Sequence, residues 1–346
     1  MSNTPFDYGG FMSTYILIDL SNLLHRAKHV TSGTVDLKIG MSMHIIFNSI
    51  LKMWRKFDAD HIVVCLDSKS WRREVYTQYK AARRLTVAQK SVREQEEDDV
   101  FNEAFNDLVK FLDEKTNVTV LKSVGLEADD FIAQWVKIHP NDLNVIISSD
   151  SDFYQLLADN VKIFNGVTDL LITKDGVYDE KDRKLEFTLK NDGKLKVGKP
   201  NENFNPDSDW VEWAKFSKIM RGDAGDGIFT AYPKVRQTAL RNAYDDRKGK
   251  GYNWNNLMLQ TWTDHEGVTH RVLDCFERNR MLIDLNDLPP EIAELTEQVI
   301  NETTKAKHVP NIGIWFKKFC HLHNLQRLEK NAINHATYLA SPYKKD

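Results

Sequence analysis

The sequence has no long hydrophobic run, few cysteines and almost no excess of either charge. No apolar stretch approaches the roughly 18 residues that a membrane-spanning helix needs. The three cysteines, Cys65, Cys275 and Cys320, lie far apart without a CxxC pair, which argues against a zinc site or a disulfide framework. The first residues, MSNTPFDYGGF, lack the basic and apolar regions of a secretory signal. We therefore expect a monomeric, cytoplasmic protein that does not associate with a membrane.

Length and charge set only loose limits on fold and function. The chain has 346 residues, more than a typical single domain, so we expect two domains. Its 47 Lys and Arg against 50 Asp and Glu give a net charge of −3. That balance neither favours nor excludes nucleic acid as a partner, so the distribution of charge along the chain decides the matter.

Acidic residues follow several short apolar segments. YILI precedes Asp19, HIVVCL precedes Asp67, VTVL leads to Glu127, and NVII leads to Asp150. The segments suit buried strands, and helix-like stretches lie between them, which predicts a parallel α/β sheet. Because ligands of such sheets bind beyond the carboxyl ends of the strands, these acids are expected to converge on one site.

The expected domain organisation follows a change of pattern along the chain. Residues 166–200 contain short alternating runs separated by the turn signals KDG and NDG, which predict β-hairpins. We expect an N-terminal tail over 1–13, an α/β domain over 14–205, and a mainly helical domain over 206–346.

The acidic residues form a candidate metal site. Carboxylates gathered in one pocket repel each other, and hard divalent cations such as Mg²⁺, or Mn²⁺ in its place, resolve this repulsion. Two ions about 3.5–4 Å apart would support phosphoryl transfer. Glu127 and Asp130 share one helix surface, whereas Asp129 is expected to point elsewhere. The alternative is that these residues merely cap strands and helices. The candidate ligands are Asp19, Asp67, Glu127, Asp129, Asp130, Asp150, Asp152, Asp223 and Asp226.

A basic segment follows the strand that ends before Asp67. Residues 69–93 carry eight Lys or Arg against one acid, Glu74. Cationic side chains there could neutralise phosphates, aromatic rings could stack on bases, and a Lys and an Arg near the metals could offset charge on the scissile phosphate. The alternative is an ordinary solvated basic helix. The candidate nucleic-acid contacts in this segment are Arg72, Arg73, Tyr76, Tyr79 and Arg84.

Five motifs resemble those of the flap endonuclease and 5′-3′ exonuclease family, and within it the T4-type bacteriophage ribonuclease H group. The motifs are IDLSNLLHR, CLDSKSWRREVYTQYKAARR, GLEADDFIA, IISSDSDFYQL and KIMRGDAGDGI, in register over about residues 15–240. The resemblance implies a PIN-like α/β nuclease core with two metal clusters, joined to a helical C-terminal domain. It also implies that the basic segment 69–93 is a helical arch through which a 5′ single strand passes.

The resemblance assigns roles to individual residues. Lys80 and Arg83 match a pair that contacts the scissile phosphate. Residues 222–240 are similar to a helix-hairpin-helix variant that grips duplex DNA, with Lys234 and Arg236 as phosphate contacts. The chain has FTAYPK where cellular members have a glycine-rich turn, so a bound potassium ion is not expected. One metal cluster would use Asp19, Asp67, Asp130 and Asp150, with Asp129 also eligible. The resemblance implies that the other would use Asp152, Asp223 and Asp226, with Glu127 either bridging the two clusters or lying behind the direct ligands.

These features together predict a metal-dependent, structure-specific 5′-nuclease. The expected activities are 5′-3′ exonuclease, flap endonuclease and ribonuclease H-type removal of RNA primers in phage-type DNA replication. The substrates would be DNA and RNA–DNA duplexes with 5′ ends or flaps. The resemblance suggests a single-strand-binding protein and a sliding clamp as partners, docking near Lys317, Lys318, Arg327 and Lys330 beside the aromatic pair Trp315 and Phe316. The favoured alternative is that the apolar residues of this region complete a second core. The alternatives are an inactive DNA-binding protein of the same fold and a PIN-type ribonuclease acting on single-stranded RNA.

Overall fold

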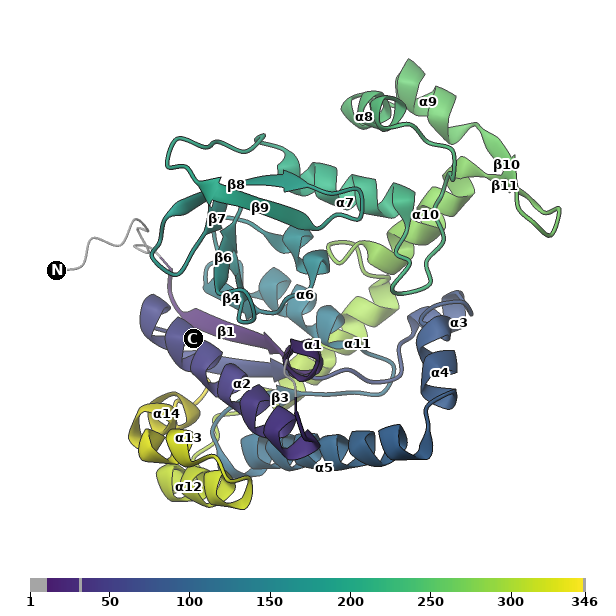
Figure 1. Cartoon of the computed structure of the whole chain (residues 1–346). Coiled ribbons are helices and arrows are strands. Elements are labelled where there is room, and N and C mark those ends of the chain that lie inside the picture. The colour runs from purple at the N-terminus through teal and green to yellow at the C-terminus, as the bar shows by residue number, and fades with distance from the viewer. Residues whose placement is uncertain (1–10, 31–32, 345–346) are drawn as a thin grey trace.

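A nine-stranded sheet forms the centre of the computed structural model, which describes residues 11–30 and 33–344 (Figure 1). The strand order is β3-β2-β1-β4-β5-β6-β7-β8-β9, and the first five strands in that order run parallel. These are β1 (Thr14–Asp19), β2 (His61–Cys65), β3 (Thr119–Leu121), β4 (Leu143–Ile147) and β5 (Val161–Asn165). The four apolar segments expected as strands are β1 to β4, and the α/β fold class is confirmed.

Antiparallel hairpins extend this sheet at one edge. They lie within the segment 166–200, where the turn signals predicted them, and they continue the same sheet instead of forming a separate unit. The strands are β6 (Leu170–Thr173), β7 (Gly176–Tyr178), β8 (Lys184–Leu189) and β9 (Leu195–Pro200).

Helices cover both faces of the sheet, because alternate residues of its central strands point to opposite sides. Ile16 and Ile18 belong to one core, whereas Tyr15 and Leu17 belong to the other. The near-continuous apolar runs of the central strands follow from this burial on two faces. The first core is covered by α1 (Leu20–Val30), α2 (Val35–Phe57), α5 (Val92–Lys115), α12 (Ile312–Leu322), α13 (Gln326–Lys330) and α14 (Ala332–Leu339). The second is covered by α6 (Ala128–Ile138), the 3₁₀ helix η1 (Ser151–Leu156) and α11 (Pro290–Thr303).

A third core forms a lobe beside the sheet (Figure 1). Its elements are α7 (Trp210–Arg221), α8 (Gln237–Asp245), α9 (Tyr252–Met258), β10 (Thr261–Thr263), β11 (Thr269–Arg271) and α10 (Val272–Ile283). The sequence pattern predicts one helical domain over residues 206–346, but in the structure these residues pack in more than one core. Helices α7 to α10 contribute to the third core, whereas α11 to α14 pack against the layers of the sheet. The boundary at 205/206 stays a prediction.

The basic segment runs from the end of β2 to the start of α5. It contains α3 (Arg72–Val75) and α4 (Ala81–Ala88), and α4 buries none of its side chains. Figure 1 shows both short helices standing at the margin of the sheet, above the N-terminal end of α5. Among the described residues, no helix is both long and apolar enough to cross a membrane.

Candidate active site

Carboxylates from three parallel strands and one helix meet at the carboxyl edge of the sheet. Asp19 is the last residue of β1, Asp67 and Asp150 follow β2 and β4 within three residues, and Asp129 lies in the first turn of α6. Backbone amides fix three of them. Asp19 accepts a hydrogen bond from the amide of residue 22 at 3.0 Å, Asp67 from that of residue 128 at 3.0 Å, and Asp150 from that of residue 152 at 3.0 Å.

These four carboxylates lie close enough to affect one another, and no described side chain supplies them with a cationic partner. Burial, Asp67 and Asp150 together raise the pKa of Asp19 well above its ordinary value. Burial, followed by Asp19, Asp150 and Asp67, raises the pKa of Asp129 in the same way. None of the four forms an ion pair with a Lys or Arg whose side chain the structure describes. We call Asp19, Asp67, Asp129 and Asp150 the uncompensated cluster.

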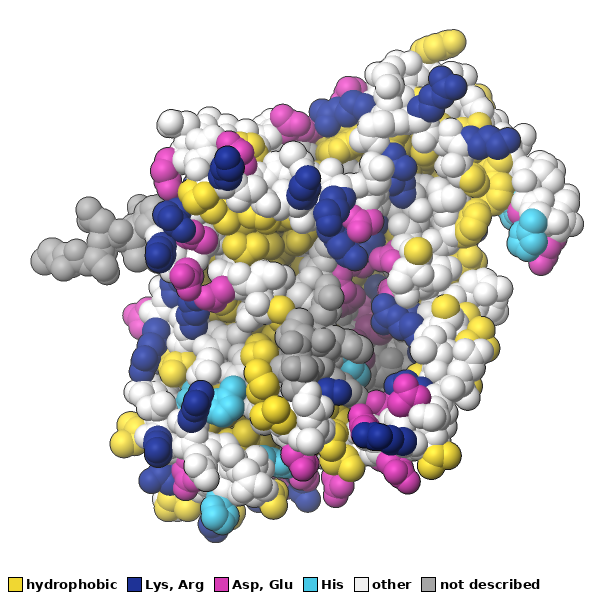
Figure 2. All heavy atoms as spheres, in the orientation of Figure 1, with side chains coloured by type: hydrophobic (Ala, Val, Ile, Leu, Met, Phe, Trp, Pro, Cys, Tyr) yellow, Lys and Arg dark blue, Asp and Glu magenta, His cyan; other side chains and the backbone are white. Residues whose placement is uncertain are grey.

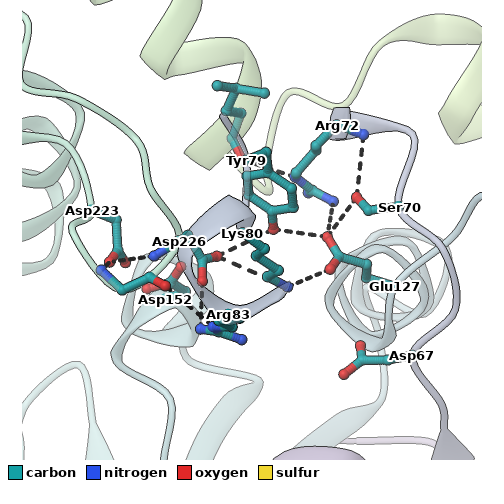
Figure 3. Close-up of polar contacts among 12 residues, drawn as sticks. Asp67, Ser70, Arg72, Tyr79, Lys80, Arg83, Glu127, Asp152, Asp223 and Asp226 are labelled. Carbon is teal, nitrogen blue, oxygen red and sulfur yellow. Dashed lines mark hydrogen bonds and ion pairs between the residues drawn. The ribbon is translucent and has the colours of Figure 1, made fainter. Parts of the chain in front are cut away.

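A second group of carboxylates is paired with cations throughout. Glu127, Asp152, Asp223 and Asp226 form this compensated cluster (Figure 3). The Nζ of Lys218 contacts Asp152 and lies 2.9 Å from Oδ2 of Asp223. The Nζ of Lys80 contacts Glu127, and Nη2 of Arg83 lies 2.6 Å from Oδ1 of Asp226.

Glu127 is the most heavily bonded carboxylate of the compensated cluster. Its Oε2 accepts hydrogen bonds from the Ser70 hydroxyl at 2.7 Å, Arg72 Nη1 at 3.1 Å and the Tyr79 hydroxyl at 2.9 Å. Burial alone would raise its pKa, but Lys80 and then Arg72 outweigh burial and lower the pKa to about 2. Glu127 therefore stays ionised, and its bonds to Ser70, Arg72, Tyr79 and Lys80 tie the basic segment 69–93, which we call the arch, to the start of α6.

The loop from Asp223 to Ile228 carries two further carboxylates and is held against the arch. The amide of Lys80 donates to the Asp226 carbonyl at 2.6 Å. Gly227 has φ +71°, and a Cβ there would lie 2.5 Å from the carbonyl oxygen of Gln78, so the close approach requires glycine. Burial opposes ionisation of Asp223, yet Lys218 lowers its pKa; for Asp226, burial prevails over Lys80 and Arg83 and raises the pKa.

The cations of the arch, the basic segment 69–93, line an open cavity beside the acids. The cavity has a volume of about 400 Å³, and Arg73, Lys80, Arg83 and Arg84 line it together with acidic residues that include Asp67. The Nε of Arg73 is buried there without a hydrogen-bond partner. A phosphate group is the kind of ligand that such a cluster of donors suits.

The structure reverses the sequence-based preference for Asp130 over Asp129. Asp130 is fully buried, its Oδ2 accepts the Glu127 amide at 2.9 Å, and its Oδ1 lies 2.9 Å from Nη2 of Arg72. The spacing of three between Glu127 and Asp130 reflects capping of a helix, not two carboxylates aimed at one ion. Asp129 is the residue of this helix that faces the uncompensated cluster.

Two predicted nucleic-acid contacts are also corrected. Arg72 is buried between Glu127 and Asp130, and its Nε donates to the carbonyl oxygen of Leu282 at 2.9 Å. Tyr79 is buried as well, and its hydroxyl donates to carboxylates, so its ring offers no surface to a base.

Three other predicted contacts are at least partly accessible. Tyr76 is half-buried and directly follows α3. Lys234 and Arg236 are exposed before α8, as phosphate contacts would need to be.

Lys218 is the residue of this site that the sequence analysis missed. It lies on α7 among Phe216, Ile219 and Met220, which are buried in the third core. The sequence did contain a signal: Lys218 lies in a largely apolar stretch shortly before the pair Gly222 and Asp223. Ser70 and Ser148, which donate to Glu127 and Asp19, carried no comparable pattern.

The donor chemistry of the uncompensated cluster fits a hard divalent cation. All its side-chain donors are carboxylate oxygens, and their repulsion raises the pKa of Asp19 and of Asp129 without relief from a described cation. Among the described residues, no three Asp, Glu, His or Cys side chains already stand in the geometry of a metal-binding group. The fit therefore rests on the chemistry of the donors and their common position, because repelling carboxylates have no reason to converge by themselves.

Comparison with known proteins identifies the family. Residues 14–186 match the family described as 5′-3′ exonuclease, N-terminal resolvase-like domain. The chain belongs to the 5′-3′ exonuclease family. DNA polymerase I of Borreliella burgdorferi is 27% identical over 183 residues, which cover 48% of this chain and 18% of the polymerase. Flap endonuclease Xni of Psychromonas ingrahamii is 24% identical over 177 residues, which cover 48% of this chain and 62% of Xni. The chain thus spans less than two thirds of the length of either relative.

Solved structures from bacteriophage T5 share the fold over most of the chain. The T5 D15 protein co-crystallised with metal ions matches with a TM-score of 0.54 and 20% identity, covering 93% of this chain and 99% of that one. The T5 5′-exonuclease with bound zinc matches with a TM-score of 0.57 and 22% identity, covering 84% and 99%. The T5 D15 flap endonuclease in complex with DNA and metal ions matches with a TM-score of 0.56 and 21% identity, covering 90% and 99%. At this identity the likeness establishes the resolvase-like, PIN-type fold with its helical C-terminal region.

Proposed function

We propose that this chain is a divalent-metal-dependent, structure-specific 5′-nuclease that hydrolyses phosphodiester bonds at 5′ ends and flaps. The observation that carries the proposal is the uncompensated cluster at the carboxyl edge of the sheet, next to an arch whose cations line the same cavity as Asp67. Family membership supports it, as do the names of relatives, which include a flap endonuclease and a T5 flap endonuclease crystallised with DNA and metal ions.

Asp19, Asp67, Asp129 and Asp150 would hold the ion, and Mg²⁺ or Mn²⁺ suits their oxygen donors. Such an ion, when bound, lowers the pKa of a coordinated water and offsets charge on a phosphoryl oxygen. Ser148 donates to Asp19 at 3.2 Å and keeps one of these carboxylates oriented.

The cations of the arch would act on the phosphate. Lys80 is held by Glu127 and Arg83 by Asp226, so both are positioned before a substrate arrives. Arg73 and Arg84 line the same cavity and would bind a neighbouring phosphate. Lys234 and Arg236 would contact the duplex backbone away from the site of cleavage.

A second resident ion does not fit the compensated cluster as it is arranged. Its carboxylates are Asp152, Asp223, Asp226 and Glu127, and Lys218, Lys80 and Arg83 already neutralise them. An ion could enter only if these ion pairs gave way. We therefore assign no step to a second ion, although the sequence resemblance implies one.

Finer features of the expected function also remain part of this proposal. They are Mg²⁺ as the ion, removal of RNA primers from RNA–DNA duplexes, a role in phage-type replication, and docking of a single-strand-binding protein or a sliding clamp. The surface suggested for docking is smaller than expected, because Phe316 is fully buried in the first core. The groups that stay available to a partner include Trp315, over which Lys115 and Lys318 lie, and the exposed residues Lys317, Arg327 and Lys330.

The direct test is cleavage of labelled 5′-flap, nicked and RNA–DNA duplexes in Mg²⁺, with the products mapped to the nucleotide. Asp150→Asn should abolish cleavage without unfolding the protein, whereas Asp99→Asn, an exposed position on α5, should leave cleavage unchanged. Full activity of the Asp150 variant would remove that residue from the site. Tight binding of flaps without any cleavage by the native chain would instead identify an inactive DNA-binding protein. Cleavage confined to single-stranded RNA would identify a ribonuclease.

A further inference from the structure

Three aromatic rings form a ladder on the surface of the third-core lobe. The Phe229 ring stacks on Trp262, with centroids 5.5 Å apart and planes inclined by 28°. Trp262 in turn packs against His270, with ring centroids 4.6 Å apart and planes tilted by 30°. The inner rings are fixed, because Trp262 Nε1 donates to the carbonyl oxygen of Ala231 at 2.9 Å and His270 lies 2.7 Å from Asp264. Phe229 is 51% exposed, so the ladder ends in a ring that is open to solvent.

Arg278, which forms no ion pair with a described acidic side chain, bonds to the backbone of the residue that carries the open ring. The guanidinium of Arg278 lies 4.9 Å from the centroid of Tyr76, and its Nη2 donates to the carbonyl oxygen of Phe229 at 3.1 Å. Its other hydrogen bonds go to the neutral side chain of Asn279. Among the described residues Arg278 forms no ion pair, so its charge is not neutralised next to the ladder.

The ladder is close to the candidate active site along the chain and in space. Phe229 follows Asp226 by three residues, and the amide of Lys80 binds that loop at 2.6 Å. Tyr76, on which Arg278 rests, is the residue at which α3 ends. In Figure 1 the β10–β11 hairpin, which carries Trp262 and His270, projects on the same side of the molecule as α3 and α4. Phe229 therefore belongs to the segment that connects the Asp226 loop, which the arch holds, to α8 of the third-core lobe.

We propose that Phe229 and Arg278 form a subsite for one unpaired nucleotide of the substrate, whose base stacks on Phe229 and whose phosphate binds Arg278. An exposed ring at the end of a fixed stack presents a flat π surface, and bases stack on such surfaces without regard to sequence. A guanidinium with no carboxylate nearby supplies the matching charge for a phosphate. The subsite rests on the proposed nuclease function and extends it to the strand beyond the cleavage site.

The experiment uses the full chain and a 5′-flap duplex that carries the fluorescent adenine analogue 2-aminopurine at each of the first three unpaired positions in turn. Ca²⁺ replaces Mg²⁺ so that binding is measured without cleavage. Stacking on Phe229 should quench one of the three probes. Phe229→Leu should restore that fluorescence and weaken flap binding about five-fold or more. Phe229→Tyr, which keeps the ring, should behave as the native chain does.

Matched variants separate the subsite from general effects. Tyr252→Leu removes an aromatic ring that is 80% exposed on α9 of the same lobe and should change neither quenching nor affinity. An abasic nucleotide at the quenched position should weaken binding by the native chain as much as Phe229→Leu does, with no further loss in the variant. Arg278→Gln should reduce the salt dependence of binding by about one unit of slope.

Two outcomes overturn the proposal in distinguishable ways. Unchanged quenching and affinity in Phe229→Leu, in a native chain that binds and cleaves flaps, removes the subsite and leaves the nuclease function standing. The ladder would then serve the hairpin fold or a protein partner. Failure of the native chain to bind any flap removes the proposed function itself, and the subsite with it.

Discussion

The two acidic clusters of the candidate site contain similar residues, yet the fold treats their charge in opposite ways. In the uncompensated cluster, burial and mutual repulsion raise the pKa of Asp19 and Asp129. In the compensated cluster, ion pairs with lysines and arginines hold Glu127 and Asp223 ionised, with their pKa values lowered. The same side-chain chemistry therefore leaves carboxylate charge without a described counter-charge in one cluster and builds a network of ion pairs in the other.

The difference shows that the number of carboxylates at a strand edge does not by itself identify metal ligands. What separates the clusters is whether a lysine or arginine can reach the carboxylates. Lys218 reaches Asp152 from α7, and Lys80 reaches Glu127 from the arch. The described side chains include no such cation for Asp19, Asp67, Asp129 or Asp150. An added cation would therefore relieve more electrostatic repulsion there than in the compensated cluster.

The adjacent pair Asp129 and Asp130 gives the strongest test of this contrast. Asp129→Asn should lower the cleavage rate about 100-fold or more, because ion binding supplies several kcal/mol of stabilisation to the transition state. Asp130→Asn should instead lower the free energy of unfolding by about 3–5 kcal/mol, because it leaves Arg72 without one of its buried partners. Single-turnover kinetics and urea unfolding of both variants measure the two effects. Loss of activity in Asp130→Asn with unchanged stability would restore the assignment made from the sequence.

Removing Lys218 from the compensated cluster should make it resemble the uncompensated cluster, because Asp152 and Asp223 then lose their cationic partner. Lys218→Met should lower the unfolding free energy by about 3 kcal/mol without metal, since Asp152 and Asp223 then face each other unpaired. It should also increase the number of Mn²⁺ ions bound, as counted by electron paramagnetic resonance. Lys215→Met, on the same helix, is the control. A native chain that already binds two ions tightly would show that Lys218 yields to the second one.

Lys80 belongs to the compensated cluster but faces the cavity, so its effect should fall on the rate. Lys80→Ala should raise the barrier to cleavage by about 2–4 kcal/mol if its charge stabilises the transition state. Flap affinity in Ca²⁺ should change little. Lys90→Ala, at the far end of the arch where Lys90 pairs with Asp98, provides the comparison. An effect on affinity alone would reduce Lys80 to an ordinary phosphate contact.

In the metal-free protein, Asp19 and Asp129 of the uncompensated cluster should respond to pH in the direction opposite to Glu127 of the compensated cluster. Asp19 and Asp129 have raised pKa values, so their contribution to stability is complete below the ordinary value of 3.8 and is lost as pH rises through the raised values. Glu127 has a pKa of about 2 against an ordinary 4.5, so its contribution is present above 4.5 and is lost as pH falls toward 2. Melting temperatures in EDTA from pH 2 to 8 should show both trends. Asp129→Asn should weaken the loss of melting temperature as pH rises and should leave the loss at low pH, which is due to Glu127, unchanged.

Charges outside both clusters should have the smallest effects. Lys234→Ala and Arg236→Ala should each weaken duplex binding regardless of sequence and lower its salt slope by about one unit. Cleavage of bound substrate should be unaffected, because neither residue lies at the cavity. A slower single-turnover rate at saturating enzyme would contradict this separation of binding from chemistry.

Much of the fold and the general position of the site could be predicted from the sequence. The apolar runs that end at Asp19, Asp67 and Asp150 became parallel strands with their acids at one edge, because strand burial and chain direction are local properties of such runs. The partners of the charged residues could not be predicted in this way. Arg72 and Glu127 are 55 residues apart, and the basic pattern around Arg72 gave no sign that its guanidinium would be buried.

The sequence by itself determined the strands and the edge of the sheet at which the acids meet, since these follow from short-range pattern, and the resemblance of its motifs indicated the family. Only the tertiary structure decided which acids pair with a described cation and which do not. One step along α6 separates Asp129, which faces other carboxylates, from Asp130, which is locked to Arg72. Lys218 reaches the site from α7, a helix that packs in the third core. The role of a charge depends on what lies within a few ångströms of it, and long-range packing alone sets those neighbours.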